Sequence, residues 1–458
     1  MEITNELMDR AAKGKTPIHI EPAKNKDLLA SLIQAITNLF LFVFDGVLIY
    51  LKLPEYYQLI SADDTIRLIY YLMDAETRLL FRSYEIKDCF DRMKNFPELQ
   101  VRINDECAKN REYLNLANGV FDIRTMKEVH NTSQMVFDYH YELRYTPDST
   151  LDQAPEMKAF LRSSLGESNI ECFRRMLAYC LSSLVKGRVC FLLIGKGKTG
   201  KSTLLNLIER MVPKGTVSHE PFHRMASEQS KAKYRNKRLN ISRDNSSTPM
   251  KHEESFKSLI SAEMTTSRDV YEKSVDFVPT LKFLFASNQE LAFAHPDDAV
   301  YDRIVPLVFS REIPEDKRDL DLEDKLYMER DIVFSWAVDS LGSLIESNYN
   351  FCMSEESKEY LSHRRMNLHT VPDFLAELVE VDPAGEVASS KLFKAYEDWC
   401  SRNGLNAIGR NKFYGEVAGC IPSVKRTKVQ MAGQQLQGFK GIKMRSAYTS
   451  TIITTDEE

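Results

Sequence analysis

Residues 189–203 read VCFLLIGKGKTGKST, and this stretch decides the fold. The unbroken apolar run over 189–194 is typical of a buried parallel strand. The next eight residues, 195–202, fit the pattern G-x-x-x-x-G-K-[ST] at every fixed position. Since the pattern alone arises by chance in roughly two chains per hundred at average residue usage, its setting matters. An amphipathic helical pattern follows over 203–211, and strand, loop and helix in this order predict a P-loop.

The residue types of this loop suit the binding of phosphate. Glycines allow backbone N–H groups to turn inward around phosphate oxygens, and the helix N-terminus adds a partial positive charge. Lys201 is expected to reach the β- and γ-phosphates of ATP, and the Ser202 hydroxyl to ligate Mg²⁺. A surface turn rich in Gly and Lys is the alternative. The expected nucleotide-binding residues are Gly195, Lys196, Gly197, Lys198, Thr199, Gly200, Lys201, Ser202 and Thr203.

Further short apolar runs predict the other strands of a parallel sheet. They lie at 239–242, 281–286 and 305–309, with helical patterns between them, which indicates an α/β core. Asp244 follows the first of these runs, so it is a candidate to hold Mg²⁺ or to orient the attacking water. A solvated carboxylate in the polar turn Asp-Asn-Ser-Ser is the alternative.

Two more polar residues flank the later strands. Asn288 follows the run 281–286 and is a candidate to position the attacking water, with a turn-forming asparagine as the alternative. Arg303 precedes the run 305–309 and is a candidate to stabilise transition-state charge, including on the nucleotide of a neighbouring subunit. A structural ion pair with Asp302 or Asp297 is the alternative for Arg303.

Length and composition limit the class of protein. The 458 residues allow two to four domains, and 43% hydrophobic and 28% charged residues are ordinary for a globular protein. A net charge of −5 means that any nucleic-acid site must be a local patch. None of the eight cysteines lies in a CxxC pair, which favours free thiols in a reducing cytoplasm. We expect no signal peptide and no membrane span, since the most apolar stretch, 39–53, is short and interrupted by charges.

The remaining patterns outline the domains. Residues 1–16 are expected to be a loose charged leader, and 39–50 two strands joined at Asp45-Gly46. Helices are expected at 65–73, 85–93, 156–165, 170–185 and within 320–345, and short strands at 113–122 and 142–145. Residues 389–446 are expected to form two helices and a basic hairpin. The predicted division is 1–150, an α+β N-terminal domain; 151–350, the P-loop domain; 351–370, a linker; and 371–458, a C-terminal domain.

The ordered motifs resemble superfamily 3 helicases of the phage, plasmid and poxvirus primase–helicase group. Besides the P-loop and the strand with its acid, the matching residues are Phe256-Lys257, Arg268, Tyr271, 277–280, 285–288, the segment LNLANGVFD at 114–122, 145–155, the helix ending at Tyr179, 392–403 and Lys412-Phe413. The resemblance covers most of residues 37–446. It implies a helicase-associated N-terminal domain, an AAA+-like core and a C-terminal winged helix.

The sequence departs from the family pattern at three places. The strand acid is usually Glu but is Asp244 here, a common Gly-Asp pair is replaced by Ala262-Glu263, and the late arginine pair is reduced to Asp302-Arg303. The role of Asp244 in hydrolysis therefore stays open, whereas nucleotide binding does not depend on it. Since no primase fits ahead of residue 37, the resemblance implies a stand-alone helicase or initiator of a mobile genetic element.

Basic residues predict where DNA binds. Residues 409–446 contain eight basic residues and one acid, Glu416, which gives a local charge of +7 in an acidic chain. The expected duplex contacts there are Arg410, Lys412, Lys425, Arg426, Lys428 and Lys440; a solvated basic face is the alternative. A hairpin over 264–279 is expected to present Arg268 and Lys273 to a single strand in the channel of the ring, as the resemblance implies. An ordinary surface hairpin is the alternative for this segment.

These inferences combine into one expected function. We expect an ATP- and Mg²⁺-dependent DNA helicase that works as a homo-oligomer, a hexamer by the resemblance, at a replication origin, with host replication proteins as a further class of partner. An origin-binding protein that unwinds little is a second hypothesis, and a protein-remodelling P-loop ATPase or nucleotide kinase a third. The origin sequence, ring size and polarity of translocation stay open.

Overall fold

The computed structural model describes residues 4–21, 27–243, 245, 248–268, 274–294, 296–315, 319–366, 368, 370–405, 407–431 and 434–445. The chain divides into two compact units, Met1–His295 with Asp302–Ser357, and Pro296–Tyr301 with Lys358–Glu458. Two of the expected functional residues, Asp244 and Lys273, lie outside the described residues.

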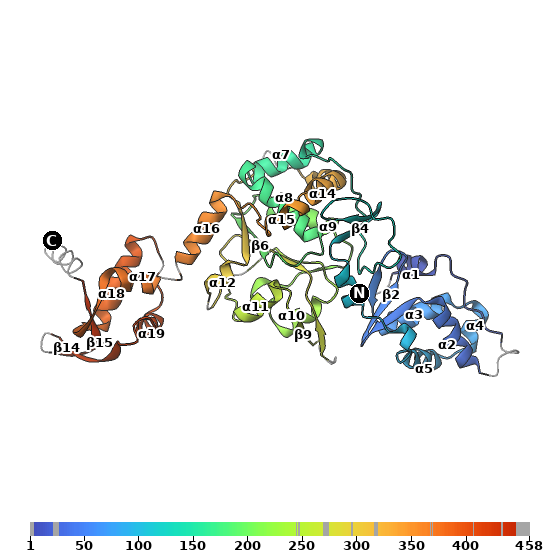
Figure 1. Ribbon diagram of the computed structural model, residues 1–458, viewed down its shortest axis with the longest axis horizontal. Coiled ribbons are helices and arrows are strands. Elements are labelled where there is room, and N and C mark those ends of the chain that lie inside the picture. The colour runs from blue at the N-terminus through green and yellow to red at the C-terminus, as the bar shows by residue number, and fades with distance from the viewer. Residues whose placement is uncertain are drawn as a thin grey trace. The chain divides into compact units, whose positions relative to one another are not determined.

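A five-stranded parallel sheet forms the core of the first unit (Figure 1). Its strands are β6 (Cys190–Gly195), β7 (Val217–Ser218), β8 (Leu239–Ser242), β11 (Lys282–Ser287) and β12 (Ile304–Phe309), in the spatial order β12-β6-β11-β8-β7. The predicted α/β core is therefore confirmed. Only the two-residue edge strand β7 was not expected, because two residues carry no periodicity.

Burial explains why these runs are strands in the middle of the sheet. Every residue of β8 and β11 is buried, as are the first five of β6. Helices between and around the strands cover the sheet, with α8 packed on α14 and α9 packed on α13. These helices of the first unit are α7 (Pro155–Ser164), α8 (Ile170–Leu181), α9 (Lys201–Met211), α10 (Glu228–Lys233), α11 (Glu253–Ile260), α13 (Leu322–Met328), α14 (Arg330–Val338) and α15 (Leu341–Glu346).

The N-terminal part of the first unit combines helices with small antiparallel sheets. Its strands are β1 (Phe42–Asp45), β2 (Leu48–Lys52) and β3 (Tyr57–Ile60) in one sheet, and β4 (Tyr113–Leu116) and β5 (Gly119–Asp122) in another. Its helices are α1 (Asn5–Ala12), α2 (Leu28–Leu39), α3 (Ala62–Leu72), α4 (Ala75–Leu80), α5 (Ser83–Met93) and α6 (Ile103–Lys109). The hairpin at Asp45-Gly46 was predicted correctly.

Two expectations for this part were wrong. The leader is not loose, because residues 5–12 form α1, whose N-terminus is capped by the Thr4 side chain and whose Met8 and Ala11 are buried. Residues 142–145 form no strand; only Tyr141 bridges to Leu116. Their apolar side chains are buried, so burial without ladder pairing produced the strand-like pattern.

The second unit contains a small domain with a three-stranded antiparallel sheet. Its elements are α12 (Asp298–Tyr301), α16 (Glu355–Met366), α17 (Thr370–Leu378), β13 (Val379–Ala388), α18 (Ser389–Arg402), α19 (Arg410–Cys420), β14 (Lys425–Met431) and β15 (Gln434–Met444), with the strand order β13-β15-β14. The two helices and the basic hairpin were predicted, whereas α17 and β13 were not. Helix α16 spans most of residues 351–370, where a linker is predicted.

None of the helices in the described part of the chain is both long and apolar enough to span a membrane.

Candidate functional site

The loop after β6 folds as a phosphate-binding loop requires. Gly195 has φ +157°, and a Cβ there would lie 2.2 Å from the Phe309 carbonyl oxygen, so strand β12 leaves no room for a side chain. Gly200 has φ +92° and caps α9, where a Cβ would lie 2.9 Å from the Phe160 ring. The two glycines of the pattern are therefore required by close packing as well as by the turn itself.

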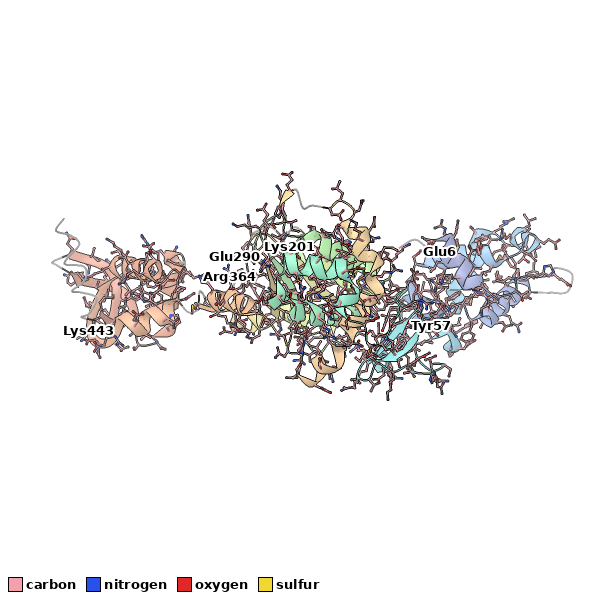
Figure 2. All side chains as sticks on the ribbon, turned by 90° about the horizontal axis from the view of Figure 1, so that it is seen from above. Glu6, Tyr57, Lys201, Glu290, Arg364 and Lys443 are labelled. Atoms are coloured by element: carbon pink, nitrogen blue, oxygen red, sulfur yellow. The ribbon has the colours of Figure 1, made fainter. Side chains whose placement is uncertain are left out.

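Lys201 folds its ammonium group over this loop. Its Nζ donates to the carbonyl oxygens of Gly195 at 2.7 Å and Lys196 at 2.6 Å, and lies 3.2 Å from the Thr199 hydroxyl. Only 7% of the residue is exposed, and burial lowers the pKa of its amine. Phosphate oxygens are stronger acceptors for an ammonium than carbonyls, so a bound phosphate would take over these hydrogen bonds. Figure 2 labels Lys201 within the first unit.

The start of α9 completes a site that fits a nucleotide bearing Mg²⁺. The helix begins at Lys201, so its first N–H groups point into the loop where phosphate binds. The side chain of Ser202 is exposed rather than packed, so its hydroxyl is accessible to a cation. Gly197 has open space around it. Donors for phosphate and a hydroxyl for a metal therefore meet within one turn of chain.

The strand order brings Asn288 beside this loop. Strand β11 lies between β6 and β8, with Ser287 opposite Ile194 and Phe285 opposite Ser242. Asn288 is thus the first residue beyond the strand on the edge where the P-loop begins, and its side chain is exposed. Strand β8 ends with Ser242 at the same edge. Asp244 itself lies outside the described residues.

Arg243 and Asn245, which follow β8, make contacts with two different elements of the core. The guanidinium of Arg243 donates to Asn206 of α9 at 3.0 Å and forms an ion pair with Glu209 of the same helix. The amide of Asn245 donates to the Ala286 carbonyl at 2.9 Å, and its oxygen accepts from Ser242 at 2.9 Å. The carboxyl end of β8 is therefore tied to α9 on one side and to β11 on the other.

Neither of these two positioning roles was predicted. The sequence around Asn245 has the composition of a polar turn, and nothing in it shows that the asparagine reaches the neighbouring strand. Similarly, the backbone N–H of Ile313 donates to the Lys198 carbonyl at 2.9 Å, so the chain after β12 supports the P-loop from the other side. A contact between backbones leaves no signal in the side-chain pattern.

Arg303 lies at the opposite edge of the sheet. Its carbonyl accepts from the Cys190 N–H at 2.8 Å, at the amino end of β6, whereas the P-loop starts at Gly195. Five residues of strand at about 3.3 Å each separate these points by about 17 Å, which is farther than an arginine side chain extends. The guanidinium lies 3.4 Å from the Ser261 hydroxyl. Arg303 is therefore not positioned to contact its own P-loop.

The predicted hairpin between β8 and β11 is present. Strands β9 (Thr265–Ser267) and β10 (Val275–Phe277) pair antiparallel, with Ser267 opposite Val275. Arg268 directly follows β9 and is exposed. Lys273, expected near the tip of the hairpin, lies outside the described residues.

The basic residues of the second unit are less uniform than their spacing suggests. Lys440 pairs with Glu386 at 2.7 Å and Lys443 with Asp382 at 3.1 Å, both carboxylates of β13. Figure 2 labels Lys443 in this unit. The count of +7 over 409–446 omitted these acids because they precede that segment in the chain. The local charge is therefore lower than expected, and Lys440 is already neutralised.

The other basic residues of this unit are more accessible. Arg410 lies 5.0 Å from the Phe393 ring centre, and Arg426 lies 4.3 Å from that of Tyr414. These rings hold the guanidinium groups near the surface of α18 and α19. Lys412 is 3.8 Å from Glu416 on the same helix, and Lys425 and Lys428 on β14 are exposed.

Comparisons with known proteins agree with this architecture. Residues 193–303 match the model of a family described as "Family of unknown function (DUF5906)", and residues 369–440 match "Poxvirus D5 protein-like". Two segments of the chain are therefore similar to these two families. The resemblance inferred from the motifs is thus confirmed, and the match over 193–303 spans the P-loop, β8, β11 and Arg303.

Solved structures support the fold of the chain. Two apo structures of the NrS-1 C-terminal region each cover 91% of this chain and 100% of their own, at 12% identity, with TM-scores of 0.51 and 0.53. At this identity they show the fold alone. No curated protein matches the chain.

Proposed function

We propose that this chain is an ATP-dependent DNA helicase that acts as a replication initiator. Residues 151–350 form its AAA+-like ATPase domain, residues 1–150 its helicase-associated domain, and residues 371–458 a winged helix. The protein assembles into a hexameric ring, hydrolyses ATP and unwinds DNA at an origin.

In this proposal the carboxyl edge of the core sheet carries the chemistry. Lys201 holds the β- and γ-phosphates, Asn288 orients the attacking water, and Ser202 with Asp244 holds Mg²⁺. The metal ion, when bound, neutralises charge on the phosphate oxygens. The contacts of Arg243 with α9 and of Asn245 with β11 support a defined carboxyl end of β8.

The register of β12 on β6 is the observation that supports assembly into an oligomer. Arg303 lies about 17 Å along the sheet from its own P-loop, so an arginine that completes a nucleotide site must complete that of another subunit. A ring provides such a neighbour at every interface. This observation favours a working assembly over a self-sufficient monomer.

The DNA contacts follow from two surfaces of the chain. The order α17, β13, α18, α19, β14, β15 is a helix–strand–helix–helix–strand–strand arrangement suited to a winged helix, with α19 for the major groove and the β14–β15 hairpin for the backbone. Arg268 and Lys273 of the β9–β10 hairpin grip single-stranded DNA in the channel.

The test is ATP turnover with and without single-stranded DNA, alongside the native mass. We expect stimulation by single strands and an assembly with several copies of the chain. An ATP turnover rate that is the same with and without single-stranded DNA would contradict the proposal, as would full activity of a monomer at every concentration.

A second candidate function is duplex origin binding with little unwinding. It is favoured by the exposed basic side chains of Lys425 and Lys428 on the β14–β15 hairpin. Sequence-selective footprints that persist in the Lys201→Ala variant, together with no stimulation of turnover by single strands, would favour this candidate.

A further inference from the structure

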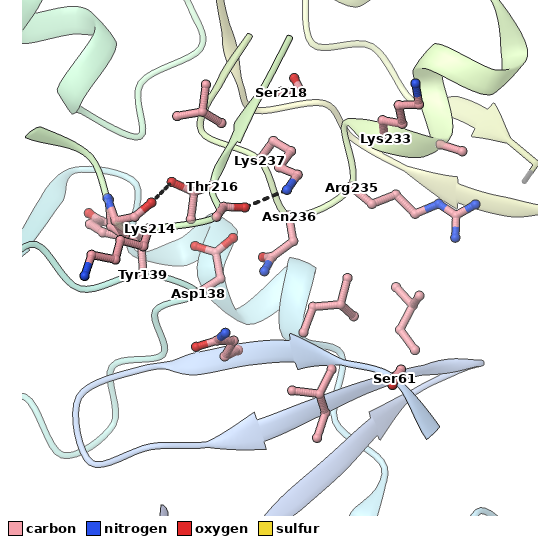
Figure 3. A pocket seen from close by; sticks show the side chains of 18 of the residues that line it. Ser61, Asp138, Tyr139, Lys214, Thr216, Ser218, Lys233, Arg235, Asn236 and Lys237 are labelled. Carbon is pink, nitrogen blue, oxygen red and sulfur yellow. Dashed lines mark hydrogen bonds between the residues drawn. The ribbon is translucent and has the colours of Figure 1, made fainter. Parts of the chain in front are cut away.

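A groove begins at the amino edge of the core sheet, opposite the edge that carries the P-loop. Its main cavity, of about 550 Å³, lies within the first unit between the sheet β1–β3 and the turns that lead into β7 and β8 (Figure 3). Two more cavities, of about 690 and 330 Å³, adjoin it, and Pro213 and Lys214 line all three. The three cavities therefore adjoin the same turn at 213–215, and together they are called the groove.

The two walls of the main cavity differ in chemistry. Strands β2 and β3 and the turn between them supply an apolar and uncharged wall that includes Leu48, Leu59, Tyr56 and Gln58. The opposite wall supplies four cations, Lys214, Lys233, Arg235 and Lys237. An apolar wall facing a cationic wall matches a single nucleic-acid strand, whose bases are unpaired on one side and whose phosphates lie on the other.

Carboxylates only partly offset these cations. Two line the cavity, Asp138 and Glu220. Glu220 is paired with Lys233 at 2.6 Å and also accepts from the Ser230 hydroxyl. Asp138 lies in the field of the guanidinium groups of Arg111 and Arg238 behind the wall. The main cavity is therefore electropositive, although the chain carries a net charge of −5.

The cations are held in place rather than spread over a surface. The amine of Lys237 donates to the Gly215 carbonyl at 2.6 Å, as Figure 3 shows, and the Nε of Arg235 donates to the Ser267 hydroxyl at 3.0 Å. Lys214 is exposed at the centre of the groove, and within the described part of the chain its ammonium has no partner. Lys214 is thus the cation best placed to bind an incoming anion.

The wall formed by β1–β3 is fixed against the rest of the first unit. The Tyr57 N–H donates to the Phe137 carbonyl at 2.7 Å, and the Asn115 amide donates to the Glu55 carbonyl at 2.8 Å. Arg10 pairs with Glu55 at 3.0 Å from a third direction. These bonds tie the β1–β3 wall to three other segments of the first unit.

We propose that this groove binds a segment of single-stranded DNA, with phosphates on Lys214 and its neighbours and bases against the β2–β3 wall. The inference rests on the proposed DNA helicase function and adds a strand path outside the ATP site. Linked cavities favour a strand over a mononucleotide, because a mononucleotide would fill only one. The apolar wall favours a single strand over a duplex, since the bases of a duplex are stacked inside and cannot reach this wall.

The test measures binding of a fluorescent oligothymidylate to the full chain at several salt concentrations. Lys214→Glu should weaken binding about fivefold or more near 0.1 M salt, because each phosphate contact to a single strand adds about 0.7 to the salt slope. Gln58→Glu keeps the shape and the acceptor for the Tyr56 hydroxyl but places a negative charge in the groove, so it should also weaken binding.

The matched control is Lys87→Glu. This exposed lysine of α5 lies outside the groove, and its reversal changes the net charge equally. Weaker binding by both groove variants but not by the control, with DNA-independent ATP turnover unchanged, supports the proposal. Equal binding by all three overturns it while leaving the helicase function intact.

Two other outcomes also overturn it. Thymidine monophosphate or inorganic phosphate could compete with the oligonucleotide for the wild-type chain but not for the variants. If the variants nevertheless bind the oligonucleotide normally, the groove is a small-anion site. If the wild-type chain binds no single strand, this inference and the proposed function fail together, and the DNA-stimulated ATPase assay identifies that case.

Discussion

Replacing Arg303 by alanine should abolish ATP turnover, because the arginine is expected to complete the nucleotide site of a neighbouring subunit. Its backbone is bonded to Cys190 at the amino end of β6, about 17 Å along the strand from the P-loop. A finger supplied in trans contributes a factor of about 10³–10⁵ to turnover, which corresponds to about 4–7 kcal/mol of transition-state stabilisation.

The assay mixes two inactive variants, Lys201→Ala and Arg303→Ala. Some interfaces of a mixed ring pair an intact P-loop with an intact arginine, and these should recover turnover if Arg303 acts in trans. Native mass must first show that subunits exchange. A ring in which all subunits must hydrolyse ATP together would also remain inactive. Thermal melting checks that both variants fold.

Two results would refute the reasoning. If Arg303→Ala alone retains turnover within a few-fold of the wild type, the arginine has no catalytic role. A monomer with full activity at every concentration would exclude action across a subunit boundary. Arg303→Lys is a useful control, since it keeps the charge but loses the planar fork, and it should recover only part of the activity.

Other variants test other parts of the structure. Lys201→Ala should abolish turnover and leave the fold intact, since the ammonium contacts the loop itself; wild-type turnover in the folded variant would exclude the P-loop assignment. Residues 371–458 should bind duplex DNA with steep salt dependence; no binding at low salt would contradict the winged helix. Lys428→Glu should weaken this binding more than Lys443→Glu, because Lys443 is already paired with Asp382. Burial holds the pKa of Lys282 well below its usual value, so the unfolded chain binds a proton at this amine more readily than the folded chain does. The contribution of Lys282 to the free energy of unfolding therefore rises with pH toward the unfolded pKa near 10.4. Lys282→Met should therefore show a smaller gain in urea midpoint between about pH 7 and pH 9.5 than the wild type, and equal gains would argue against a neutral amine.

Local patterns determined much of this protein. The P-loop could be identified from sequence because its strand, glycines, lysine and helix are consecutive, so their chemistry depends on few distant contacts. The same holds for the strands of the core, where short apolar runs between helices match β6, β8, β11 and β12 within a residue or two at their ends. The hairpin at Asp45-Gly46 was similarly local.

Only the tertiary structure decided which residues meet. No pattern in the sequence indicates that β11 lies between β6 and β8, and this order alone brings Asn288 beside the P-loop. The pairing of Lys440 with Glu386 and the groove around Lys214 depend on segments that are distant in the chain. Parallel strands are joined by crossovers, so their order, and therefore the edge on which each side chain lies, is set by the packing of the whole sheet and not by the residues of any one strand.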